Sequence, residues 1–211
     1  MNRCKPSKHK SGKWHSRHEG RIATPIALVL FSGGIDSSAC VRYYLEQRYS
    51  VTGLFVRFGQ ASMLMEWKAA GKLARHFGIP LKEIDVSGIP WQGQIPFELQ
   101  GRNALLASVG LCAFPGKSGL VSMGLHAGTP FPDCSTQFQV MASNLAQIST
   151  QGRIAFDFPF GASDKSQIVA YCQRMGVPIE LTYSCQRGKK MNCGICPSCL
   201  DRQSFLGAHN K

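Results

Sequence analysis

An apolar strand signal followed at once by a turn rich in glycine and serine constrains the fold more than any other feature of this chain. Residues Ile26–Phe31 form a continuous apolar run, as expected of a strand that is buried on both faces of a parallel sheet. The turn that follows is Ser-Gly-Gly-Ile-Asp-Ser-Ser (residues 32–38), and a helical pattern covers residues 37–47. A strand, a tight turn and a helix in this order predict the opening unit of an α/β fold.

Signals for strands and helices alternate along the rest of the chain. The further strands are expected at 51–56, 81–86, 119–125 and 153–158, and the further helices at 63–77, 103–114, 137–148 and 164–175. Asp164 and Gln167 have the spacing of a helix-capping pair, while residues 87–101 are expected to form a loop. This alternation predicts a three-layer, Rossmann-like α/β sandwich with a mostly parallel sheet. Such sheets bind ligands beyond the carboxyl ends of their strands, so the turn after Phe31 is the first candidate site.

The turn at residues 32–38 has the composition of a phosphate-binding loop. Gly33 and Gly34 let backbone N–H groups approach an anion, and the start of the next helix favours phosphate through its unpaired N–H groups and its dipole. A carboxylate repels phosphate, so we expect Asp36 to be a magnesium ligand or a helix cap. The spacing of the Rossmann dinucleotide motif and that of the Walker A motif are both missing. Further donors are the hydroxyls of Ser32, Ser37 and Ser38.

Four of the nine cysteines gather near the C-terminus. Cys185, Cys193, Cys196 and Cys199 supply enough thiolates for a closed tetrahedral site, which predicts a structural zinc ion. The alternatives are an iron–sulfur cluster and ordinary free thiols; the absence of any other C-x-x-C pair favours zinc. The odd number of cysteines and the lack of a signal peptide predict a cytoplasmic protein without a disulfide framework.

The basic charge of the chain is concentrated at its N-terminus. The sequence holds 24 Lys and Arg against 12 Asp and Glu, and residues 1–21 alone carry seven basic residues against one acidic residue. We expect this segment to be a flexible tail, either solvated or attracted to an anion such as RNA. The remaining residues show no aromatic and basic patch, which argues against a nucleic-acid partner. No apolar run approaches the roughly 20 residues that a membrane-spanning helix needs, so no membrane association is expected.

Four motifs occur in the order seen in one enzyme family. They are Phe-Ser-Gly-Gly-Ile-Asp-Ser-Ser (31–38), Gly-Arg-Asn (101–103), Pro-Asp-Cys (132–134) and the cysteine-rich stretch 182–205. With these motifs the chain resembles the 7-cyano-7-deazaguanine synthase family, within the PP-loop superfamily of N-type ATP pyrophosphatases. The resemblance runs from about residue 26 to residue 205.

The resemblance implies an ATP-dependent carbon–nitrogen ligase of queuosine biosynthesis. Its family converts 7-carboxy-7-deazaguanine and ammonia into 7-cyano-7-deazaguanine, using ATP and Mg²⁺. ATP adenylates the carboxylate, ammonia displaces AMP to give an amide, and a second activation allows dehydration to the nitrile. The resemblance also implies a homodimer, the usual oligomeric state of the family. The implied organisation is a tail (1–21), a PP-loop ATP-binding domain (22–183) and a zinc-binding segment packed on that domain (184–211).

The resemblance also implies a role for each matched residue. Arg102 is expected to contact a carboxylate or phosphate through its guanidinium fork, and Asp133 to accept N–H groups from the guanine-like edge of the substrate. The implied catalytic residues are Asp36, Arg102 and Lys165; the ATP-binding residues are Ser32, Gly33, Gly34, Asp36, Ser37 and Ser38; the substrate-binding residues are Gln60, Arg102, Asn103 and Asp133; and the zinc ligands are Cys185, Cys193, Cys196 and Cys199.

The chain departs from the family pattern after the second expected strand. The family usually has Phe-Asp-Tyr-Gly-Gln-Arg-His there, whereas this chain has Val-Arg-Phe-Gly-Gln-Ala-Ser at 56–62, so Arg57 replaces an acid and the histidine is missing. Gln60 is retained, and Glu66 matches the acidic position of the next helix after one inserted residue. Alternatives are therefore a paralogue that stops at the amide or joins the activated deazaguanine to another amine, for example on a protein. A tRNA-modifying PP-loop enzyme and a non-enzymatic zinc-ribbon module are further alternatives.

Overall fold

The computed structural model of the chain describes residues 24–89, 99–129 and 131–206. The basic tail expected at 1–21 and residues 90–98 of the expected loop lie outside the described residues. In chain order the elements are β1 (Ile26–Leu30), α1 (Ile35–Glu46), β2 (Ser50–Arg57), α2 (Met63–Phe77), β3 (Leu81–Asp85), α3 (Arg102–Cys112), β4 (Gly119–Ser122), the 3-10 helix η1 (Pro132–Cys134), α4 (Thr136–Thr150), β5 (Ile154–Asp157), α5 (Lys165–Arg174), the 3-10 helix η2 (Ile179–Leu181) and α6 (Pro197–Leu206).

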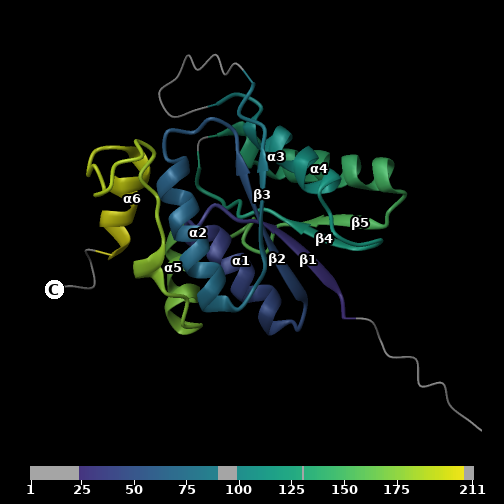
Figure 1. Ribbon diagram of the computed structural model, residues 1–211, viewed down its shortest axis with the longest axis horizontal. Helices are drawn as coiled ribbons and strands as arrows, with labels where there is room; N and C mark the ends of the chain where they lie inside the picture. The colour runs from purple at the N-terminus through teal and green to yellow at the C-terminus, as the bar shows by residue number, and fades with distance from the viewer. Residues whose placement is uncertain (1–23, 90–98, 130, 207–211) are drawn as a thin grey trace, which may run out of the picture.

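The five strands form one parallel sheet in the order β3-β2-β1-β4-β5. Helices α1, α2 and α5 cover one face of the sheet, and α3 and α4 cover the other (Figure 1). The predicted three-layer Rossmann-like fold is confirmed. Within the described ranges, no helix is long and apolar enough to cross a membrane.

The central strand β1 supplies both halves of the core because its side chains alternate between the two faces of the sheet. Ala27, Val29 and Phe31 pack against α1, α2 and α5, whereas Leu28 and Leu30 pack against α3 and α4. All five are buried. This double burial explains why the strand is apolar at every position, and it holds the turn after Phe31 at a fixed place above the sheet.

Two boundaries differ from the sequence-based expectation in ways that shape the site. Helix α1 begins at Ile35, and its N-cap is Gly34 without a side-chain hydrogen bond, so the helix-cap interpretation of Asp36 is wrong. Strand β4 ends at Ser122, three residues before the expected end. The chain leaves the sheet there because residues 123–126 turn to line a cavity.

Candidate active site and metal centre

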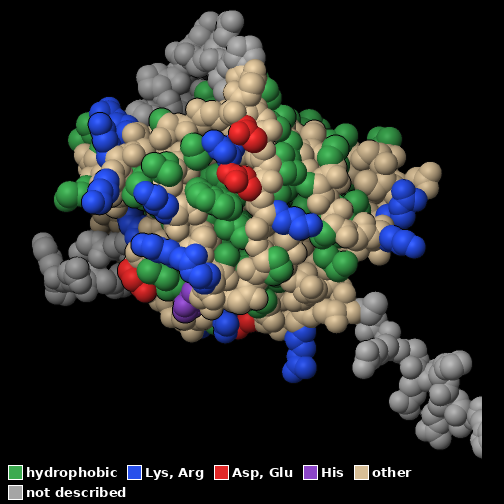
Figure 2. Space-filling view, in the orientation of Figure 1, with side chains coloured by type: hydrophobic (Ala, Val, Ile, Leu, Met, Phe, Trp, Pro, Cys, Tyr) green, Lys and Arg blue, Asp and Glu red, His purple; other side chains and the backbone are tan. Residues whose placement is uncertain are grey.

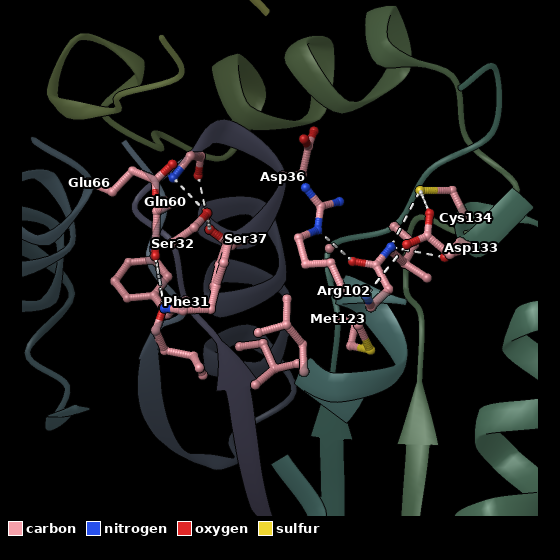
Figure 3. A pocket seen from close by; sticks show the side chains of 18 of the residues that line it. Phe31, Ser32, Asp36, Ser37, Gln60, Glu66, Arg102, Met123, Asp133 and Cys134 are labelled. Atoms are coloured by element: carbon pink, nitrogen blue, oxygen red, sulfur yellow. Dashed lines mark hydrogen bonds between the residues drawn. The ribbon is translucent and has the colours of Figure 1, made fainter. Parts of the chain in front are cut away.

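A cavity of about 330 Å³ lies beyond the carboxyl ends of β1, β2 and β4. From β1 the chain proceeds to β2 and β3 on one side, and it then crosses to β4 and β5 on the other side. This reversal of strand order is where parallel α/β sheets bind their ligands. The lining is apolar toward the strands, at Leu30, Leu54 and Met123, and carries polar side chains from the loops and helix starts (Figure 3).

Most of the residues predicted from the sequence meet in this cavity. The lining includes Ser32, Gly34, Asp36, Ser37, Gln60, Arg102, Asn103 and Asp133. Of the predicted catalytic, ATP-binding and substrate-binding residues, three do not line the cavity: Gly33, Ser38 and Lys165. These three instead hold lining residues in place.

The loop at residues 32–38 is shaped by its own hydroxyls. Gly33 has a φ of 77°, a left-handed conformation that glycine adopts without strain. The hydroxyl of Ser32 accepts a hydrogen bond from the backbone N–H of Gly34 and lies 3.3 Å from the hydroxyl of Ser37. The buried hydroxyl of Ser38 donates to the carbonyl of Gly34 at 2.8 Å. Ser38 therefore holds the loop, while Ser32 and Ser37 present oxygens to the cavity.

The segment after β4 packs tightly against the first turn of α1. A Cβ atom on Gly124 would lie 2.9 Å from the backbone nitrogen of Ser37 and 3.0 Å from the carbonyl carbon of Asp36. Only a residue without a side chain allows this approach. The contact brings His126 and its neighbours to the rim of the same cavity, although nothing in the sequence motif predicted them there.

Asp36 lines the cavity and is held from behind by Lys165. The ammonium group of Lys165 lies 2.6 Å and 2.7 Å from the two carboxylate oxygens of Asp36. Both side chains are mostly buried, at 18% and 24% exposure. Lys165 is the first residue of α5, which Asp164 and Gln167 begin with the predicted capping box. The cap fixes the start of α5 and so places the Lys165 ammonium group beside the loop at residues 32–38.

Arg102, Asn103 and Asp133 come together where α3 begins. The Nε of Arg102 donates to the side-chain oxygen of Asn103 at 3.2 Å. The amide of Asn103 donates to the backbone carbonyl of Asp133 at 2.9 Å, and its backbone N–H points to the Asp133 carboxylate at 3.4 Å. Asn103 is only 3% exposed and ties α3 to η1. Among the described residues no carboxylate lies within ion-pair distance of Arg102, so its fork faces the cavity without a charged partner.

Gln60 is occupied by internal hydrogen bonds. Its side-chain oxygen accepts from the backbone N–H of Phe58 at 2.9 Å, and its amide donates to the carbonyl of Val56 and to the carboxylate of Glu66, both at 3.2 Å. A second donor to Glu66 is the hydroxyl of Ser62, at 2.7 Å. Gln60 therefore closes the turn after β2 and orients Glu66, which also lines the cavity.

Arg57, the main departure from the family pattern, is not among the residues that line the cavity. It pairs with Glu83 at 3.5 Å and with Asp85 at 3.6 Å on the edge strand β3. Its neighbours Val56 and Phe58 line the cavity, whereas the Arg57 side chain lies against β3. Figure 2 shows basic and acidic side chains side by side on the surface over this edge of the sheet.

Replacing Arg57 with glutamine should leave activity nearly unchanged. The pairs of Arg57 are between one-third and one-half exposed, so their loss should lower the free energy of unfolding by at most about 1 kcal/mol. Urea unfolding and steady-state kinetics of the variant would measure both quantities. A large rise in the KM of any substrate would show that Arg57 reaches the cavity.

The four C-terminal cysteines form a compact cluster. Their sulfur atoms all lie within 4.8 Å of one another, and those of Cys193 and Cys199 are 3.8 Å apart. A tetrahedral zinc ion with Zn–S bonds of about 2.3 Å requires about 3.8 Å between sulfurs. Burial opposes ionisation of Cys185, but backbone N–H groups, including that of Cys193, lower the pKa of this thiol to about 6. The donor set and its spacing fit a structural zinc site.

The cysteine segment forms part of the wall of the cavity. Gln186 follows the first cysteine, Ser198 precedes the last one, and both line the cavity. The backbone N–H of Tyr183 donates to the carbonyl of Gly33 at 2.9 Å, which ties the segment to the loop at residues 32–38. Gly188, with a φ of 65°, packs against the backbone of Ala61 in the turn before α2. The cysteine cluster therefore packs directly against the cavity and helps to form its wall.

Comparison with known proteins was made with this geometry in hand. The model of the family described as Queuosine biosynthesis protein QueC matches residues 26–94 and 92–209 of the chain. The chain belongs to the QueC family. Its cavity, loop and cysteine cluster are therefore those of a QueC-family protein.

Three curated relatives of this QueC-family protein are each named 7-cyano-7-deazaguanine synthase. The relative from Methanothermobacter thermautotrophicus is 28% identical over 205 aligned residues, which cover 84% of this chain and 92% of that protein. The relative from Desulforudis audaxviator is 30% identical, covering 82% and 92% of the two chains. The relative from Synechococcus sp. (strain CC9605) is 31% identical, covering 85% and 92%. These relatives support an enzyme.

Proposed function

We propose that this protein is an ATP-dependent ligase that converts 7-carboxy-7-deazaguanine and ammonia into 7-cyano-7-deazaguanine through an adenylated acid and an amide. The observation that carries the proposal is a single cavity that is lined both by the loop at residues 32–38 and by the side chains of Arg102 and Asp133. Ser32 and Ser37 lie on one side of it, and Arg102 and Asp133 lie on the other (Figure 3). The names of the relatives support the same substrate.

In this proposal the loop and the start of α1 bind the phosphates of ATP. Backbone N–H groups at the start of α1 and the hydroxyls of Ser32 and Ser37 donate to phosphate oxygens. Asp36 is the carboxylate that would hold Mg²⁺ against those phosphates, and Lys165 supplies a second positive charge beside it. The ion screens the negative charge of the triphosphate. Catalysis then rests on positioning and on stabilising the leaving pyrophosphate.

The acid binds on the opposite wall. The fork of Arg102 fits the carboxylate of the acid and brings it to the α-phosphate, and the side chain of Asn103 keeps the fork in place. Asp133 accepts N–H groups from the guanine-like edge. Zn²⁺ holds the C-terminal segment that carries Gln186 and Ser198. We further propose that the protein is cytoplasmic, since its cysteines are free thiols. We also propose that it forms a homodimer, as is usual in the family.

Incubation with ATP, MgCl₂, ammonium and 7-carboxy-7-deazaguanine, followed by mass spectrometry, tests this function. We expect the nitrile, together with AMP and pyrophosphate. Accumulation of the amide alone would identify the paralogue that stops there. Conversion only when a protein or a tRNA is added would identify another acceptor. Unreacted acid without AMP in every mixture would refute the proposal.

Replacing Arg102 with alanine should lower kcat/KM for the acid by roughly a hundredfold to a thousandfold, because the carboxylate loses its charged donor. The effect on the KM for ATP should be much smaller. Arg153→Ala is the matched control, since Arg153 is exposed and its guanidinium group bonds, among the described residues, only to the side chain of Gln151. Equal losses in both variants would mean that overall charge, not the fork, matters.

A further inference from the structure

Glu66 is a carboxylate in the cavity wall that neither the metal centre nor the phosphate loop requires. It lies in the first turn of α2, partly buried, and faces the cavity beside Gln60 and Ser32 (Figure 3). Its two oxygens accept hydrogen bonds from neutral donors, the hydroxyl of Ser62 and the amide of Gln60. No lysine, arginine or histidine nitrogen of the described residues lies within ion-pair distance of it. Glu66 thus presents to the cavity a carboxylate that has no ion-pair partner among the described residues.

The other ionisable groups of the cavity are engaged or placed elsewhere. Both oxygens of Asp36 are bound by Lys165. Asp133 belongs to the opposite wall with Arg102, and it is bonded to the start of α3. A ring nitrogen of His126 lies 2.7 Å from a backbone carbonyl, and the ring is at the rim. Glu66 is therefore the available anion next to the phosphate loop, where the activated carbonyl group must form.

We propose that Glu66 binds ammonium and removes its proton, which makes it the base for the amide-forming step. The inference rests on the proposed function, which requires ammonia as the nucleophile. At neutral pH, ammonia in water is mostly protonated to ammonium. Ammonium gives one proton to Glu66, and the nitrogen lone pair forms a bond to the acyl carbon while the bond from that carbon to the AMP oxygen breaks. The proton that the nitrogen then loses passes to water, and Glu66 returns its own proton to water.

The surroundings of Glu66 make its carboxylate a stronger base than an exposed carboxylate. Burial raises its pKa above the ordinary carboxyl range, although the hydrogen bonds from Ser62 and Gln60 and the charge of Arg102 lower it. Arg102 is the charged group that acts on Glu66. Burial and, to a smaller degree, the charge of Glu66 raise the pKa of the Tyr183 hydroxyl. A stronger base accepts the proton of ammonium more readily.

The same pKa shift predicts that the Glu66→Gln variant folds. A carboxyl group whose pKa is raised in the folded state favours folding when it is protonated. That contribution is complete below its unfolded pKa and is lost as the pH rises through the folded pKa. The ionised form of Glu66 therefore opposes folding, and a neutral glutamine removes this cost. The unfolding temperature should stay at or above that of the wild type.

The test compares two half-reactions in Glu66→Gln. Exchange of ³²P-labelled pyrophosphate into ATP in the presence of the acid and without ammonium should stay within about threefold of the wild type, since adenylation needs no amine base. The amide-forming rate at low ammonium should fall roughly a hundredfold to ten-thousandfold. The deficit should shrink about tenfold for each pH unit, as free ammonia rises. Hydroxylamine, which is uncharged at neutral pH, should be used within about threefold of the wild-type rate.

The outcomes separate this inference from the function on which it rests. Wild-type protein without acid-dependent exchange would contradict the proposed function itself. Exchange lost in Glu66→Gln would mean that Glu66 serves ATP or the acid, and an unchanged KM for ammonium would mean that it does not bind the amine; either result overturns the inference. Glu83→Gln is the matched control, because Glu83 pairs with Arg57 outside the cavity and should keep the ammonium KM.

Discussion

Replacing Gly33 with alanine should abolish ATP binding and lower the free energy of unfolding by about 2–4 kcal/mol. Gly33 has a φ of 77°, which a residue with a side chain adopts only under strain. A Cβ atom there would also lie 2.6 Å from the backbone nitrogen of Ala70 and 2.9 Å from the carbonyl oxygen of Glu66. Because both neighbours are backbone atoms of α2, the loop or the helix must move. Calorimetric titration with ATP and urea unfolding would measure the two effects.

Gly71→Ala is the matched control for this loop variant. Gly71 lies in α2, the helix that Gly33 contacts. The nearest atom to a Cβ added at Gly71 is a guanidinium nitrogen of Arg75 at 3.7 Å. Alanine there should stabilise the protein by up to about 1 kcal/mol, because it is a better helix former, and should leave ATP binding intact. Normal ATP affinity in Gly33→Ala would contradict the assignment of residues 32–38 to phosphate.

Replacing Cys196 with serine should remove the metal and, with it, the ATP-dependent activity. Cys196 is buried among the other three sulfurs, so a site with one ligand fewer holds zinc weakly. Zinc content should fall from about one ion per chain to near zero, and the unfolding temperature should fall by about 10 °C or more. The activity is lost because Gln186 and Ser198 leave the cavity wall and Tyr183 no longer fixes the loop at Gly33. Elemental analysis, thermal unfolding and the product assay measure these changes.

Cys112→Ser is the control for the cysteine variant, since Cys112 is an exposed free thiol on α3. It should keep the metal content, the stability and the activity of the wild type. Substantial iron in the wild-type protein would favour the iron–sulfur alternative. Unchanged ATP affinity in the zinc-free variant would show that the loop does not need the cysteine segment.

The parts of the fold that were predictable from sequence are those with local causes. The apolar run of β1 follows from burial on both faces, and the shape of the next turn follows from Gly33 and the serines near it. The start of α5 follows from a cap and its partner three residues later, Asp164 and Gln167. Each signal is complete within a few neighbouring residues, so no knowledge of the tertiary structure is needed.

The contacts that complete the site depend on residues far apart in the chain. Lys165 and Asp36 are 129 positions apart, and only the packing of α5 beside α1 brings them together. Helix α6 was missed because the cysteine spacing dominates its sequence, although Pro197 at its first position is a typical start signal. Ser198 and Gln186 carried no signal of their own.

The hydrogen bond between Tyr183 and Gly33 has a consequence for how the protein matures during synthesis. The loop at residues 32–38 is synthesised long before the part of the cavity wall that includes Gln186 and Ser198. Domains form from the N-terminus onward as the chain emerges. A nascent chain can therefore assemble its sheet before its cavity is complete, because the cavity wall needs the cysteine segment. If the four cysteines bind zinc, as we propose, completion of the cavity is coupled to the cellular supply of zinc.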